Sequence, residues 1–113
     1  MVYKMKITEL LVKDRMNLDL QSVTKDEVIN ELAEMFLSTG IIDDLEGFMG
    51  EIKNREALSS TALEEGIAIP HAKTKYVKKP ALAFGRSKKG IDYESLDGEP
   101  STIFFMIAAP EDA

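Results

Sequence analysis

The sequence predicts a single α/β domain, and three features of the chain support this fold class. Residues 25–39 and 44–57 each repeat apolar side chains with the period of an amphipathic helix. Residues 103–109 form a continuous apolar run that ends at a proline, which is typical of a strand buried in the middle of a sheet. At 113 residues the chain is close to the usual domain size of ~100–150 residues, so it builds one core.

Composition and charge exclude several classes of protein. The chain is 44% hydrophobic and 30% charged, and no apolar run approaches the ~20 residues of a membrane span. A formal net charge of −6 argues against nucleic-acid or anionic-membrane binding, which needs basic surface, and favours a basic protein partner. Residues 1–6 carry no signal-peptide pattern and there is no cysteine, so we expect a cytoplasmic location.

The N-terminal third predicts a helical turn, a strand and a long helix. Residues 7–11 suit a short helical turn, and residues 16–20 alternate apolar and polar side chains like a half-buried strand. Thr24 and Glu27 form a capping box that opens a helix, and Gly40 is placed to end it. The residues of this helix that we expect to face the core are Val28, Ile29, Leu32, Ala33 and Phe36.

A second helix is expected to begin at Asp43 or Asp44 and to run to about Ala57. Its predicted inward stripe contains Leu45, Phe48, Met49 and Ile52, and continuing that stripe by one step reaches Arg55. Two interpretations of this arginine remain open. It either complements the helix dipole and extends to water, or it binds an anion through its paired N–H donors.

The only histidine follows a predicted short strand. Residues 66–69 are apolar, and Pro70 should end the strand because proline has a fixed φ and no N–H donor. His71 then lies where a strand opens into a loop, the usual position of ligand sites in α/β sheets. The following lysine-rich residues 72–80 are either a solvated loop, which we favour, or a source of positive field for this site.

Residues 81–86 predict a strand with large side chains on one face and small ones on the other. The dipeptides Lys89-Gly90 and Asp97-Gly98 are turn signals, and residues 91–93 between them suit a short pairing segment. The central strand 103–109 needs cover on both faces, yet only two substantial helices are predicted. We therefore expect one face of the sheet to lack part of its cover.

The sequence favours chemistry by histidine itself. One histidine without cysteine does not make a usual zinc site, so we predict no metal, and we predict no cofactor. The residue types leave a Ser-His-Asp hydrolase open, because serines and acids abound, but nothing resembles the G-x-S-x-G elbow. A neutral imidazole can attack a phosphoryl group and hold it as a phosphoramidate. Arg55, Ser60 and Thr61 offer donors for the phosphoryl oxygens. The alternative is that His71 is a structural histidine.

Residues 55–61, Arg-Glu-Ala-Leu-Ser-Ser-Thr, and residues 65–72, Glu-Gly-Ile-Ala-Ile-Pro-His-Ala, resemble the signature of a known family. The family is the fructose/mannitol-type enzyme IIA domain of the bacterial phosphoenolpyruvate-dependent sugar phosphotransferase system. The resemblance implies a three-layer α/β/α sandwich around a mixed sheet, and it extends over nearly the whole chain.

The same resemblance implies a phosphoryl relay. His71 would accept a phosphoryl group from the phosphocarrier protein HPr and pass it to a cysteine of enzyme IIB. Enzyme IIB in turn serves the membrane enzyme IIC in sugar uptake, and fructose is the sugar we expect. Arg55 would hold the phosphoryl oxygens, and Ser60, Thr61 and Glu65 would line the site. Two alternatives are a regulatory phosphocarrier of the nitrogen-related branch and a non-catalytic interaction module.

The chain departs from the family pattern at its end. Family members continue past the Ala-Ala-Pro-Glu segment at residues 108–111 into further helices, a region that commonly supplies a second histidine. We therefore expect residues 1–113 to be a single, partial enzyme IIA domain without the C-terminal helices.

Overall fold

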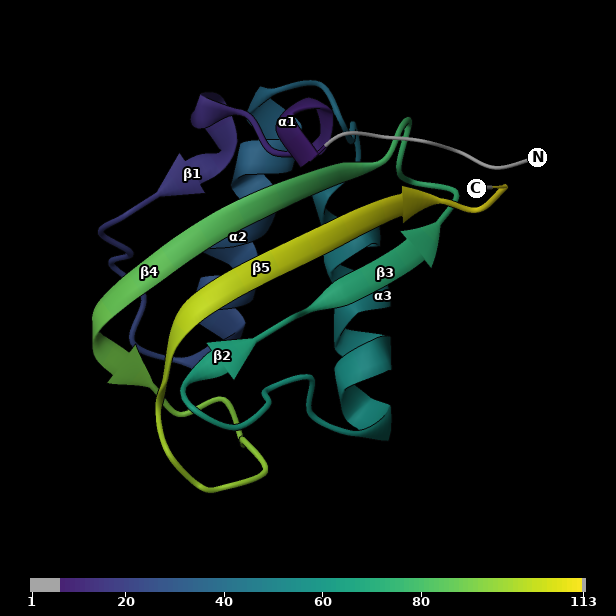
Figure 1. Cartoon of the computed structure of the whole chain (residues 1–113). Helices are drawn as coiled ribbons and strands as arrows, with labels where there is room; N and C mark the ends of the chain where they lie inside the picture. Colours follow the sequence, from purple (N-terminus) through teal and green to yellow (C-terminus); the bar gives the residue numbers. More distant parts are fainter. Residues whose placement is uncertain (1–6, 113) are drawn as a thin grey trace.

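In the computed structural model, which describes residues 7–112, a five-stranded mixed sheet carries two long helices on one face (Figure 1). The predicted α/β class and mixed sheet are confirmed. Residues 1–6, where the sequence predicts no signal peptide, and Ala113 lie outside the described part of the chain.

Groups of short elements alternate with pairs of long ones along the chain. In order they are α1 (Ile7–Leu10), a 3-10 turn (Lys13–Arg15), β1 (Met16–Asn17), α2 (Lys25–Ser38), α3 (Leu45–Leu58), β2 (Ile67–Ala68), β3 (His71–Thr74), β4 (Ala81–Ile91) and β5 (Ser101–Pro110). The sheet order is β1-β4-β5-β2, with β3 also paired to β5. Only the β4–β5 pair is antiparallel among these strands, and β5 has the internal position predicted for it.

Both predicted long helices are confirmed, together with their capping residues. Thr24 Oγ1 accepts a hydrogen bond from the Glu27 backbone at 3.2 Å, and a Glu27 carboxylate oxygen accepts one from the Thr24 backbone at 3.0 Å. Gly40, with a φ of 77°, follows the end of α2. At the start of α3, Asp44 Oδ1 accepts from the Gly47 backbone at 2.9 Å. Local hydrogen bonding therefore sets the limits of both helices.

The Thr24 cap gives the first testable prediction. Thr24→Ala should lower the free energy of unfolding by about 1 kcal/mol, because the Glu27 backbone N–H loses its acceptor. Urea denaturation followed by circular dichroism measures the change. Thr24→Ser keeps the hydroxyl and is the matched control, so equal stabilities of the two variants would contradict a capping role.

The predicted strand at residues 16–20 is wrong beyond its first two residues. Met16 and Leu18 are 43% and 51% exposed, whereas Leu20 is buried. The Asp19 backbone donates to Asn17 Oδ1 at 3.0 Å, a local turn that ends β1, and the Leu20 backbone then donates to the Arg86 carbonyl of β4 at 2.9 Å.

The two faces of the sheet differ in cover. On the helix-covered face, β4 presents small residues, and a Cβ on Gly85 would lie 2.7 Å from Leu20 and 2.9 Å from Leu32. This close approach explains the small-residue face that the sequence predicts. The opposite face carries half-buried or exposed apolar side chains: Met16, Leu82, Phe84, Ile103, Phe105 and Ile107. The described residues thus supply two of the three layers expected for the sandwich, and the expectation of one partly uncovered face is confirmed.

The sequence predicts that the strand ends at Pro70, but backbone pairing with β5 resumes immediately after it. The strand before it is β2, and the chain re-enters the sheet directly after it as β3. The Pro70 carbonyl accepts from the Ile107 backbone at 2.9 Å, so the ladder with β5 continues past the missing N–H. The prediction that His71 opens a loop is therefore wrong, because His71 is the first residue of β3.

The turn predicted at Lys89-Gly90 is also wrong, since β4 continues to Ile91 and pairs there with Ser101 across a register shift. Gly90 has a φ of 83° at this irregularity. By contrast, the predicted turn at Asp97-Gly98 is confirmed by a bond from the Gly98 backbone to the Ser95 carbonyl at 3.2 Å.

Candidate functional site

His71 is half-buried at the start of β3 and has a defined hydrogen-bond partner. Its Nδ1 lies 2.8 Å from the Ile69 carbonyl oxygen. Because a carbonyl only accepts, Nδ1 carries the hydrogen of this bond. In the neutral ring the lone pair is then on Nε2, which makes Nε2 the nucleophilic nitrogen.

A surface pocket between α3 and β3 contains both His71 and Arg55. Its lining residues are Glu51, Asn54, Arg55, Leu58, His71, Ala72 and Lys73. Arg55 lies in the last turn of α3, where its Nη1 donates to the Ser59 carbonyl at 2.8 Å. A guanidinium has five N–H donors, so this bond leaves others for an anion in the pocket. The structure thus brings together the two side chains that the sequence assigns to phosphoryl chemistry.

The buried stripe of α3 continues to Glu56 and not, as predicted, to Arg55. The buried residues of the helix are Phe48, Ile52 and Glu56, while Arg55 is half-buried and lies beside this stripe. Sequence reasoning missed Glu56 because a glutamate is seldom buried unless it is paired.

Glu56 is paired with three segments of the chain. Its carboxylate accepts from the backbone N–H of Thr61 at 3.2 Å, from the Thr61 hydroxyl, and from the Tyr93 hydroxyl at 3.1 Å. Lys25 Nζ lies 3.0 Å from the same carboxylate and 4.7 Å from the centre of the Tyr93 ring. Burial, and then the negative charge of Glu56, raise the pKa of Tyr93 well above its ordinary value, so Tyr93 stays a donor.

The other predicted site residues do not line the pocket. Ser60 Oγ donates to the Tyr93 carbonyl at 2.6 Å and accepts from the Ala62 backbone at 3.1 Å. Thr61 is buried and bonded to Glu56. Glu65 is exposed, and its backbone N–H donates to Asp97 Oδ2 at 3.2 Å. These residues hold the segment between α3 and β2 and link it to the loop that precedes β5.

Asp97, in the loop that precedes β5, has a lowered pKa because backbone N–H groups bind its carboxylate. Backbone N–H groups of Glu99 and Glu65 hold the pKa of the Asp97 carboxyl below its usual value. This carboxylate therefore ties the Glu65 turn to the loop that precedes β5.

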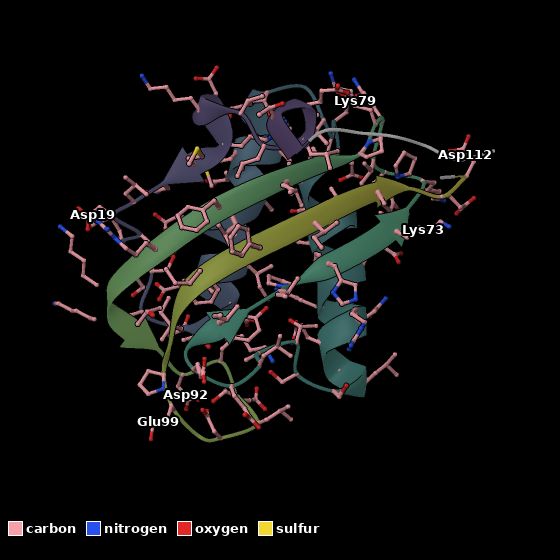
Figure 2. All side chains as sticks on the ribbon, in the orientation of Figure 1. Asp19, Lys73, Lys79, Asp92, Glu99 and Asp112 are labelled. Carbon is pink, nitrogen blue, oxygen red and sulfur yellow. The ribbon has the colours of Figure 1, made fainter. Side chains whose placement is uncertain are left out.

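Lys73 belongs to the lysine-rich segment that the sequence analysis considered as a source of positive field, and it lines the His71 pocket. Strand alternation puts positions 71 and 73 on the same side of β3, so His71 and Lys73 are neighbours. Figure 2 shows Lys73 and Lys79 toward one end of the sheet, with Asp92 and Glu99 at the other end. The lysine-rich segment is thus not the single solvated loop predicted, since part of it is β3 and contributes a cation to the pocket.

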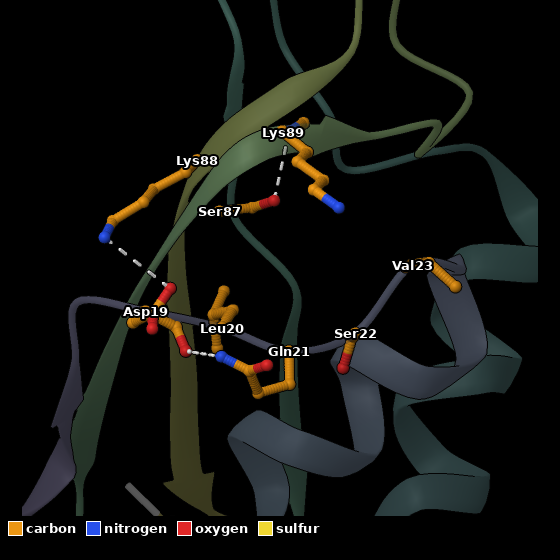
Figure 3. A pocket seen from close by; sticks show the side chains of 9 residues that line it. Asp19, Leu20, Gln21, Ser22, Val23, Ser87, Lys88 and Lys89 are labelled. Carbon is orange, nitrogen blue, oxygen red and sulfur yellow. Dashed lines mark hydrogen bonds and ion pairs between the residues drawn. The ribbon is translucent and has the colours of Figure 1, made fainter.

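A second pocket lies between β4 and the segment that connects β1 to α2, and Figure 3 shows the side chains around it. It is lined by Asp19, Leu20, Gln21, Ser22, Val23, Ser87, Lys88, Lys89 and Gly90. Lys88 Nζ and Asp19 Oδ1 are 3.9 Å apart and both side chains are mainly exposed. With neither histidine nor arginine in its lining, this pocket is the weaker candidate.

Within residues 7–112, no three histidine, cysteine or acidic side chains are grouped as metal ligands. None of the helices in that part of the chain combines the length and apolar character needed to cross a membrane.

Comparison with known proteins identifies relatives on the phosphotransferase pathway. The PTS system fructose-specific EIIABC component of Bacillus subtilis is 53% identical over 109 residues, which are 96% of this chain and 17% of that protein. The PTS system fructose-specific EIIA component of Haloferax volcanii is 35% identical over 104 residues, which are 92% of this chain and 68% of that protein. The chain therefore spans a small part of the first relative and about two thirds of the second.

A solved structure and a family model agree with these relatives. The crystal structure of the nitrogen regulatory protein IIA-Ntr from Neisseria meningitidis superposes with a TM-score of 0.86 at 28% identity, over 95% of this chain and 73% of that one. The family model of the phosphoenolpyruvate-dependent sugar phosphotransferase system, EIIA 2, matches residues 9–113. The chain therefore belongs to the EIIA 2 family of the phosphoenolpyruvate-dependent sugar phosphotransferase system.

Proposed function

We propose that this chain is a phosphoryl relay in which Nε2 of His71 is the acceptor atom. The observation that carries the proposal is the bond from Nδ1 to the Ile69 carbonyl, which leaves the lone pair on Nε2 in a pocket shared with Arg55. Relatives named as EIIA components support the same function.

The transfer has two steps. Nε2 attacks the phosphorus of phosphohistidine on HPr, so one N–P bond forms while the bond to the HPr imidazole breaks. A cysteine thiolate of enzyme IIB then attacks the same phosphorus, the bond to Nε2 breaks, and the His71 imidazole leaves in its original form. Arg55 and Lys73 would stabilise the negative charge on the phosphoryl oxygens in both steps.

The remaining residues of the predicted site act less directly in this proposal. Thr61 and Ser60 hold the segment between α3 and β2 through their bonds to Glu56 and Tyr93. Glu65 holds the turn before β2. We propose that these residues hold the backbone around the site and do not contact the phosphoryl group.

The partners and the sugar belong to the proposal as well. The Bacillus relative is named as a fructose-specific EIIABC component, which supports enzyme IIB and enzyme IIC as successive partners and fructose as the sugar. The absence of cysteine favours work in the cytoplasm. A second candidate is a regulatory phosphocarrier, which the similarity to IIA-Ntr from Neisseria meningitidis favours.

Phosphorylation of the whole chain tests the relay. After incubation with phosphoenolpyruvate, enzyme I and HPr, mass spectrometry should locate one acid-labile phosphate at His71, and ¹⁵N NMR should place it on Nε2. Phosphate on Nδ1, or none on His71, would contradict the proposal.

Adding fructose-specific enzyme IIB then separates the two candidates. Rapid loss of the label to the IIB cysteine is expected for the sugar relay, whereas retention of the label is expected for a regulatory phosphocarrier.

A further inference from the structure

The buried carboxylate of Glu56 lies outside the His71 pocket but is connected to it. Its side chain is 5% exposed, and it receives polar contacts from Lys25, Thr61 and Tyr93. A carboxylate persists in such a place only when it is paired and fully hydrogen-bonded. The arrangement fixes Thr61 in two directions, through the backbone N–H and through the hydroxyl.

One chain of hydrogen bonds leads from Thr61 to the imidazole. The Thr61 carbonyl accepts from the Ile69 backbone at 3.1 Å, and the Ile69 carbonyl accepts from His71 Nδ1 at 2.8 Å. A bond from the Leu63 backbone to the Ile67 carbonyl at 2.7 Å holds the same two segments together. The position of the Ile69 carbonyl, and with it the tautomer of His71, therefore depends on where Thr61 is held.

A second path leads to the guanidinium. Arg55 Nη1 donates to the carbonyl of Ser59, which is two residues before Thr61 and caps the C-terminus of α3. Ser60, between them, is fixed to the Tyr93 carbonyl. The turn that orients Arg55 is thus anchored by the same buried cluster.

We propose that Glu56 is a positioning residue that sets both the Nδ1–H tautomer of His71 and the orientation of Arg55 through Thr61. The inference deepens the proposed relay and rests on it for the kinetic readout only. The tautomer is measured on the unphosphorylated chain, so this part of the test does not need the relay to be correct.

The decisive variant is Glu56→Gln, with Glu94→Gln as the matched control. Both changes remove one negative charge beside Lys25, but the Glu94 side chain is 74% exposed, and the described hydrogen bonds of the Thr61 N–H and hydroxyl go to Glu56. We expect the ¹⁵N shifts of neutral His71 to report the Nδ1–H form in the unsubstituted chain and in Glu94→Gln, and a mixture of tautomers in Glu56→Gln.

We also expect Glu56→Gln, but not Glu94→Gln, to slow phosphoryl transfer to His71. Glu56→Gln should lower the rate of phosphoryl acceptance at saturating phospho-HPr roughly tenfold or more, since small misplacements of reacting groups have effects of this size or larger. The Michaelis constant for phospho-HPr should change little, because Glu56 is outside the pocket. Tautomer and rate in Glu56→Gln that match those of Glu94→Gln would overturn the inference.

Thr61 provides a second test if Glu56→Gln does not fold. Thr61→Val removes the hydroxyl bond but leaves Glu56 charged and paired with Lys25. It should shift the tautomer mixture in the same direction, and Thr61→Ser should restore the Nδ1–H form. An unchanged tautomer in Thr61→Val would contradict the path through Thr61, whereas a shifted tautomer without phosphorylation of any variant would contradict the relay alone.

Discussion

Replacing His71 with alanine is expected to abolish phosphoryl acceptance and to change the free energy of unfolding by less than about 1 kcal/mol. The reacting lone pair disappears, whereas the structural contribution of the ring is small. His71 is half-buried, and its one described hydrogen bond is to Ile69, two residues away. The backbone pairing of β3 with β5 does not depend on the side chain.

The two parts of this prediction need separate measurements. Label transferred from phosphoenolpyruvate through enzyme I and HPr reports acceptance, and urea denaturation reports stability. If His71 is instead a structural residue of an interaction module, His71→Ala should unfold the domain at clearly lower urea and the unsubstituted chain should take no label. A variant that keeps both its label and its stability would contradict every role assigned to this residue.

The sequence predicted the helices because their limits depend on neighbouring residues. The two residues of the Thr24–Glu27 box are three positions apart, and Asp44 caps α3 through the Gly47 backbone. The strand limits were predicted less well, since they depend on pairing partners far along the chain. Pro70 shows this directly, because the ladder with β5 continues through its carbonyl.

The residues of the candidate site also differ in how far they could be predicted from the local sequence. The motif around Arg55 and His71 identified two residues that the fold then brings to one pocket. Glu56 was not singled out, because two of its partners are distant in the sequence: Tyr93 is 37 residues away and Lys25 lies on another helix. Polar clusters built from distant segments have no local signature, so a structure is needed to find them.

The uncovered sheet face illustrates a correct prediction of a different kind. The sequence predicts one strand that needs cover on both faces but only two substantial helices. We therefore expected the cover of the sheet to be incomplete. In the described residues the rings of Phe84 and Phe105 meet edge to face on that side, 5.0 Å between centroids, and both stay half-buried. The aromatic pair shields part of the apolar surface that the helices do not cover.

Arg55 is the second residue whose replacement should have a large effect. Arg55→Ala should lower the rate of phosphoryl acceptance at saturating phospho-HPr by about 100-fold or more, the usual effect of losing a donor to transition-state charge. Arg55→Lys should retain part of the rate and still lose about tenfold, because an ammonium keeps the charge but not the planar pair of donors.

The matched control is Lys53→Ala, which removes a positive charge from the same helix at an exposed position outside the His71 pocket. Rapid-quench measurement of label on His71 gives the rates. If Arg55→Ala and Lys53→Ala slow acceptance equally, Arg55 acts only through general charge or as a partner of the helix terminus, through its bond to the Ser59 carbonyl. If Arg55→Lys is as slow as Arg55→Ala, the paired geometry of the guanidinium is what the phosphoryl group requires, and charge alone contributes little.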